Sequence, residues 1–107
     1  MNAGRKKKLE SQGWKVGTVQ EFVGLSNEES ALIEIKLALS RELRKRREAR
    51  MTQKELAQRI HSSQPRIVRA ESGDGSVSTD LLVRALLATD ATPKDIAKVL
   101  GAVSLPS

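Results

Sequence analysis

Residues 52–73 carry the pattern that decides the fold, and they read TQKELAQRIHSSQPRIVRAESG. Thr52 and Glu55 have capping-box spacing, in which the two side chains satisfy free backbone N–H groups where a helix begins. A short helix should follow, with its apolar residues on one face: Leu56, Ala57 and Ile60. This pattern predicts a helix that packs against its neighbours on one side only.

A second short helix is expected after a turn of about three residues. His61 and Ser62 lie in the turn, and Ser63 then caps a helix that runs to about Glu71. Pro65 is tolerated in the first turn, where backbone N–H groups have no partner inside the helix. Two apolar residues fall on the inward face: Ile67 and Ala70. Two short helices with apolar faces directed at each other predict a helix-turn-helix.

The segment before this motif predicts a long helix. Ser26 and Glu29 form another capping box, and the helix should run to about Ala49. It is acidic at its start and basic at its end, which matches the helix dipole. An apolar stripe recurs at helical spacing and is widened at its start: Leu32, Ile35, Leu39 and Leu43, with Ile33 and Leu37.

Two further helices are expected after the glycine-containing loop at residues 73–75. Ser78 should cap the first, over residues 79–89, and Thr92 should cap the second, which Gly101 ends. The last helix is expected to bury three apolar residues: Ile96, Val99 and Leu100. The sequence contains no strand pattern. The predicted fold class is therefore all-α, a compact five-helix bundle that contains the helix-turn-helix.

The N-terminal part of the sequence differs from the rest. Residues 1–17 include four consecutive cations and three glycines, and we expect a basic arm there. A short helical turn is predicted from Thr18 to about Val23, and Gly24 breaks it. Residues 18–107 are then expected to form a single helical domain.

Composition excludes several classes of function. The 107 residues include no cysteine and one histidine, His61, so thiolate zinc sites and histidine-rich metal sites are excluded. No nucleophile–base pair or glycine-rich phosphate loop is present, so we expect no enzyme, no cofactor and no metal. No uncharged run is long enough to span a membrane, and a cytoplasmic protein is expected. The net charge of +6 favours an anionic partner such as nucleic acid.

The outer face of the second short helix offers groups that read DNA bases. Four residues are expected to contact bases there: Gln64, Pro65, Arg66 and Arg69. Glutamine pairs bidentately with adenine and arginine with guanine in the major groove. The proline methylenes can contact a thymine methyl group. The alternative is that the two arginines belong to a solvated face.

Other polar residues near the two helix starts are candidates for phosphate contacts: Arg50, Gln53, Lys54, Ser62 and Ser63. Each has a structural alternative. Ser63 is first of all a helix cap, and Gln53 and Lys54 can be ordinary exposed residues. His61 is expected to adopt a left-handed backbone conformation in the turn. Glu71 is expected to end its helix or to pair with an arginine of the long helix.

These residues resemble the Cro/CI-type, or XRE-type, helix-turn-helix family, whose DNA-binding domains include that of lambda repressor. The resemblance rests on MTQKELAQRI (51–60), SSQPRI (62–67) and STDLL (78–82), and it covers roughly residues 30–100. It implies a five-helix DNA-binding domain, with a phosphate contact at Gln53 and base contacts at Gln64, Arg66 and Arg69. Family members usually carry glycine where this chain has His61 and often where it has Arg50.

A narrower resemblance involves VQEFVGL (19–25) followed by Glu28 and Glu29, which is similar to the leader of HigA-like antitoxins. It implies a protein that neutralises a RelE-like ribonuclease and represses their shared promoter.

The leading hypothesis is a sequence-specific repressor that binds a palindromic operator as a homodimer, and is associated with the nucleoid when bound. A single domain of this size buries little surface, so two copies should read half-sites about 34 Å apart. The last two helices and the tail have apolar residues that can form a dimer surface or belong to the core: Val83, Leu87, Val99, Val103 and Leu105. The alternative is a protein-interaction module that chiefly neutralises a toxin. RNA binding is disfavoured because RNA-binding modules usually stack bases on aromatic side chains and this sequence has only two. Binding of RNA or a membrane surface by the cations of residues 44–47 is disfavoured because they lie on all sides of one helix, so only part of them can face one anionic surface.

Overall fold

The computed structural model describes residues 26–103, and these residues form five α-helices without a strand. The helices are α2 (Asn27–Glu48), α3 (Gln53–Arg59), α4 (Gln64–Glu71), α5 (Thr79–Ala88) and α6 (Pro93–Gly101). The all-α fold class is thus confirmed. The expected basic arm, the helical turn at 18–23 and Leu105 lie outside the described residues.

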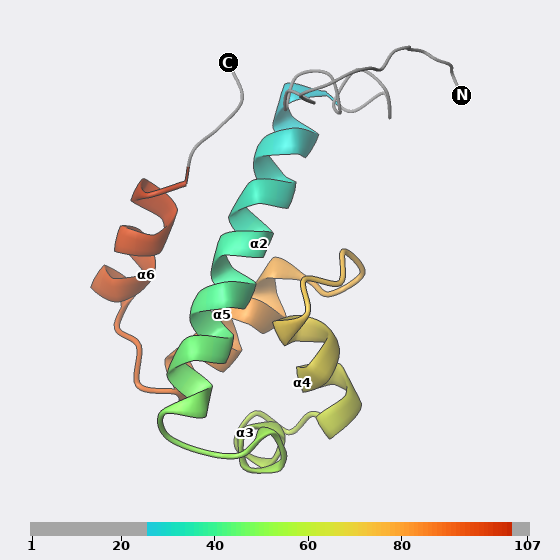
Figure 1. Ribbon diagram of the computed structural model, residues 1–107, viewed down its shortest axis with the longest axis vertical. Helices are drawn as coiled ribbons and strands as arrows, with labels where there is room; N and C mark the ends of the chain where they lie inside the picture. The colour runs from blue at the N-terminus through green and yellow to red at the C-terminus, as the bar shows by residue number, and fades with distance from the viewer. Residues whose placement is uncertain (1–25, 104–107) are drawn as a thin grey trace, which may run out of the picture. The chain divides into compact units, whose positions relative to one another are not determined.

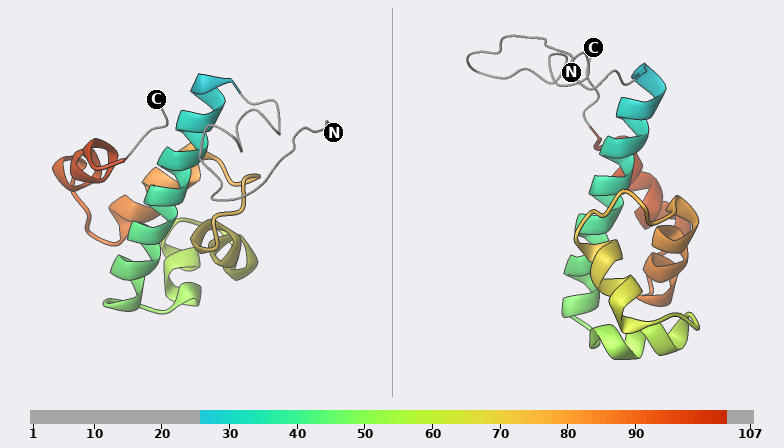
Figure 2. Two further views of the ribbon diagram at one scale, coloured as in Figure 1. Left: turned by 45° about the horizontal axis from the view of Figure 1, so that its top comes forward. Right: turned by 90° about the vertical axis from the view of Figure 1, so that its right-hand side faces the viewer.

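The residues from Ile35 to Val103 form one compact unit. Within it, α3 contacts both α4 and α5, and α5 contacts α6. Figures 1 and 2 show α3 at the end of the unit where α2 finishes, with α4 beside it. The core of this unit is aliphatic, and its fully buried large side chains come from four helices: Leu39, Leu43, Leu56, Ile67, Leu82 and Leu86. These side chains of α2, α3, α4 and α5 belong to a single hydrophobic core.

The predicted helix starts are confirmed in detail. Thr52 accepts a hydrogen bond from the Glu55 N–H at 3.0 Å, and Glu55 accepts one from the Thr52 N–H at 2.7 Å. The same reciprocal capping box forms between Thr92 and Asp95. Another forms at the start of α2, between Ser26 and Glu29. Ser63 and Ser78 cap α4 and α5 through their hydroxyl groups.

Three successive helices end with the same backbone motif. The residue after each C-cap has a positive φ angle: 55° at His61, 81° at Gly73 and 71° at Asp90. The next N–H bonds back to a carbonyl five residues earlier, as Ser62 does to Ala57 at 2.8 Å. These bonds identify Schellman motifs, which satisfy carbonyl groups at helix ends. The left-handed conformation predicted for His61 is confirmed, whereas that of Asp90 was not anticipated.

Parts of two predicted apolar stripes are wrong. Leu32 and Ile33 are 47% and 43% exposed, and within residues 26–103 the buried apolar core begins at Leu39. Leu100 is 43% exposed, whereas Ile96 is buried and Val99 packs partly against the core. Helical spacing identifies which side of a helix is apolar, but it does not show how far along that side the core extends.

Candidate nucleic-acid interface

Helix α4 is held firmly on one side and exposed on the other. Ile67 and Ala70 are completely buried, and Glu71 is 8% exposed. The Ser63 hydroxyl accepts a hydrogen bond from the Arg66 N–H at 3.4 Å, and the Schellman motif at Gly73 closes the other end. The helix therefore presents its outer side chains from a fixed backbone.

The four predicted base-contacting residues, Gln64, Pro65, Arg66 and Arg69, are all exposed on α4. Successive residues of an α-helix are rotated by about 100°. This rotation places Pro65 and Arg69 opposite the buried side, with Gln64 on one flank and Arg66 on the other. The structure thus brings the four residues together on one surface of the helix. Their contacts with bases stay predictions.

An ion pair lies beneath this surface and connects α4 to α2. The Arg47 Nε donates to Glu71 Oε2 at 2.6 Å, and Arg47 Nη2 donates to Glu71 Oε1 at 2.9 Å. The Arg47 side chain is 12% exposed and that of Glu71 is 4% exposed. The bidentate hydrogen bonds from Arg47 to Glu71 raise the pKa of the Arg47 guanidinium above its ordinary value. The pairing of Glu71 with an arginine of the long helix is confirmed.

The predicted phosphate-contacting residues do not form one surface. Gln53 is half-buried, and its Nε2 donates to Glu71 Oε1 at 3.2 Å, so it extends the ion pair instead of being free. The Ser62 hydroxyl oxygen is buried and has no hydrogen-bond partner among the described residues. Lys54 and Ser63 are exposed beside the two helix starts. Phosphate contacts by this set stay predictions, and Arg50, Lys54 and Ser63 are its exposed members.

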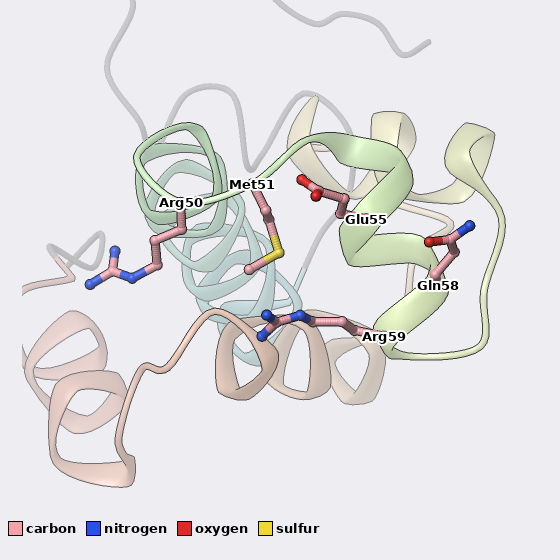
Figure 3. Close-up of a pocket in the computed structure, with 5 residues that line it drawn as sticks. All are labelled: Arg50, Met51, Glu55, Gln58 and Arg59. Atoms are coloured by element: carbon pink, nitrogen blue, oxygen red, sulfur yellow. The ribbon is translucent and has the colours of Figure 1, made fainter.

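Arg50 lies at the rim of a shallow hollow of about 360 Å³. The other residues of the rim and floor are Met51, Glu55, Gln58 and Arg59 (Figure 3). Both arginines that line the hollow donate to backbone carbonyls near helix ends, Arg50 to Arg46 O at 3.4 Å and Arg59 to Ala88 O at 3.1 Å. Figure 3 shows the Arg50 side chain pointing away from α3. Arg50 is therefore separated from the exposed groups at the start of α3.

The cations of α2 and those of α4 differ in whether they form ion pairs. Arg44, Lys45, Arg46 and Arg47 of α2 each lie within 4.0 Å of a carboxylate. By contrast, Arg66 and Arg69 of α4 form no ion pair within residues 26–103. Arg69 is still near enough to Asp74 to help lower the pKa of that carboxyl group, but neither α4 arginine is held in an ion pair by the described residues.

Two further features were checked on the described part of the chain. No helix among residues 26–103 is long and apolar enough to cross a membrane. The same residues contain no group of three or more side chains that could hold a metal ion.

Comparison with known proteins agrees with this geometry. A family model described as helix-turn-helix matches residues 41–96, which is just over half of the chain. The matched region contains all of α3, α4 and α5. Searches of curated proteins and of solved structures return no match. The chain belongs to the Cro/CI-type family of DNA-binding helix-turn-helix proteins.

Proposed function

We propose that this protein is a sequence-specific transcriptional repressor that places α4 in the major groove of its operator. The observation that carries the proposal is the composition of the outer face of α4. It combines amide and guanidinium donors with two arginines, Arg66 and Arg69, that form no ion pair with the described residues. Such donors read base edges, and the unpaired charge attracts the phosphate backbone.

We also propose that the repressor acts as a homodimer. A helix-turn-helix monomer contacts only one half-site, and two copies read half-sites about 34 Å apart along the duplex. Among the apolar residues considered for the dimer surface, Leu87 is 46% exposed. Val83, Val99 and Val103 are half-buried. Among the four of these candidates that lie within residues 26–103, Leu87 therefore has the most exposed side chain.

The test is selection of duplexes from a random-sequence pool by the full-length protein at about 0.15 M salt. A palindromic consensus is expected, and its half-site spacing reports the dimer geometry. Arg66→Ala should then weaken binding to the consensus by about 1–3 kcal/mol and relax base preference at one position. Arg84→Ala is the matched control, because Arg84 is exposed on α5 but pairs with Asp80 at 2.8 Å.

Failure of this experiment has a definite meaning. If no sequence is enriched and the remaining binding is weak and salt-sensitive, the repressor proposal is wrong. The protein would then serve as an interaction module, and a toxin-type ribonuclease is the partner to seek. That antitoxin role has its sequence support at residues 19–25, outside the described residues, and at Glu28 and Glu29.

A further inference from the structure

The outer face of α4 contains an apolar side chain that the sequence analysis did not single out. Val68 is 45% exposed, whereas Ile67 and Ala70 of the same helix are completely buried. Val68 therefore contributes little to the core. An isolated exposed valine is common on protein surfaces, so its significance depends on its neighbours.

Those neighbours are the candidate base-reading residues. Val68 follows Gln64 by four residues and Pro65 by three, and residues at these spacings are adjacent on a helix surface. Gln64 and Pro65 are exposed as well. Pro65 and Val68 thus form a small apolar strip, with Gln64 on one side and Arg69 on the other.

Local stability does not explain a valine at this position. β-Branched residues lose side-chain freedom in a helix, so alanine, glutamine or lysine would favour an exposed position of α4 more. The same branching leaves Val68 with one strongly preferred rotamer, which presents its methyl groups in a fixed direction. A stiff apolar group is suited to a surface that it contacts from outside.

We propose that Val68, together with Pro65, determines operator specificity by contacting the 5-methyl group of thymine. Thymine is the only base that presents a methyl group in the major groove, next to hydrogen-bonding atoms. Arg66 and Arg69, which form no ion pair in the described chain, are the expected contacts to neighbouring bases that keep α4 in the groove. This inference rests on the proposed function, since it requires α4 to enter the groove.

The experiment removes the methyl group from the DNA alone. Each thymine of the selected operator is replaced in turn by 2′-deoxyuridine, and Kd is measured for the full-length protein and for Val68→Ala. At one or two positions in each half-site, the replacement should weaken binding by the wild-type protein about four-fold, the effect of withdrawing one methyl group from an apolar contact. At the same positions the penalty should be clearly smaller for Val68→Ala than for the wild type, because only the Pro65 contact with the methyl group is left.

The ratio of the two Kd values is the readout, so a general change in affinity does not affect it. Leu100→Ala is the matched control, because Leu100 is also an exposed apolar residue, on α6, and this variant should keep the wild-type ratios. The inference is overturned if no thymine shows a penalty, or if Val68→Ala keeps the wild-type penalties. A failure to select any operator instead overturns the proposed function itself, and the inference with it.

Discussion

Removal of the Glu71 carboxylate should weaken the attachment of α4 to α2 and α3. In Glu71→Ala, Arg47 loses both of its charge-assisted hydrogen bonds and Gln53 loses its acceptor. The Arg47 side chain, which is 12% exposed in the wild-type structure, then carries a positive charge without its carboxylate partner. Removing one partner of a buried ion pair costs about 3–5 kcal/mol, because the remaining charge is uncompensated.

The lower end of that range applies here, for two reasons. Arg47 retains some contact with water, and its Nη1 still donates to Met51 O at 3.3 Å. We therefore expect the free energy of unfolding to fall by about 3 kcal/mol. For a domain of this size that loss corresponds to a decrease in Tm of about 12–24 °C.

Urea unfolding followed by far-UV circular dichroism measures this loss, provided that the transition is two-state. Arg47→Ala and the double variant complete a mutant cycle, and the coupling energy should be about 2 kcal/mol. Arg84→Ala is the control, because the Arg84–Asp80 pair is exposed and should contribute at most about 0.5 kcal/mol. A Glu71→Ala cost below about 1 kcal/mol, or no coupling, would show that the pair does not hold α4 in place.

Three smaller effects follow from the helix ends. His61→Gly should raise the free energy of unfolding by about 0.5–1 kcal/mol, because a φ of 55° strains any residue with a Cβ atom. Urea unfolding measures this change in stability, and a loss of stability would contradict the reasoning. Gly73→Ala should lower it by more than about 1 kcal/mol in the same assay, since φ is 81° and the added Cβ would lie 2.8 Å from Leu37 Cδ2. Hydrogen bonds from Thr92 hold the pKa of Asp95 below its ordinary value of 3.8. The ionised Asp95 carboxylate therefore contributes its full stabilisation of the fold above that ordinary value, and this contribution is lost as the pH falls through the lower pKa of the folded state. Unfolding measured from neutral to acid pH should therefore show a smaller acid loss in Asp95→Asn than in the wild type.

The helix starts could be predicted because their signals are local. A serine or threonine with an acidic residue three positions later makes a capping box without help from the rest of the chain. Thr52 and Thr92 both form such boxes, and Ser63 and Ser78 cap through their hydroxyl groups. The left-handed turn at His61 was also predictable, because it follows from the short gap between two recognisable helices.

Features that depend on distant residues could not be predicted in the same way. Leu100 has the helical spacing of a buried residue, yet it is exposed because no element of the described chain covers it. A phosphate contact by Gln53, which stays a prediction, is suggested by its position at a helix start. Its actual hydrogen bond to Glu71 spans 18 residues of sequence and required the packing of α3 against α4.

The same limit applies to charge, and it changes how the basic composition should be interpreted. Helix α2 contains a run of four consecutive cations and more positive charges than α4. In the structure, carboxylates within the described chain pair with that run, including Asp95, which is 3.7 Å from Arg46. Helix α4 has only two cations, Arg66 and Arg69, which form no ion pair in the described chain, but they lie on the same outer surface as Gln64 and Val68. A surface that reads a base sequence needs fixed donors and fixed apolar groups in one place, and α4 meets that requirement better than the more highly charged helix.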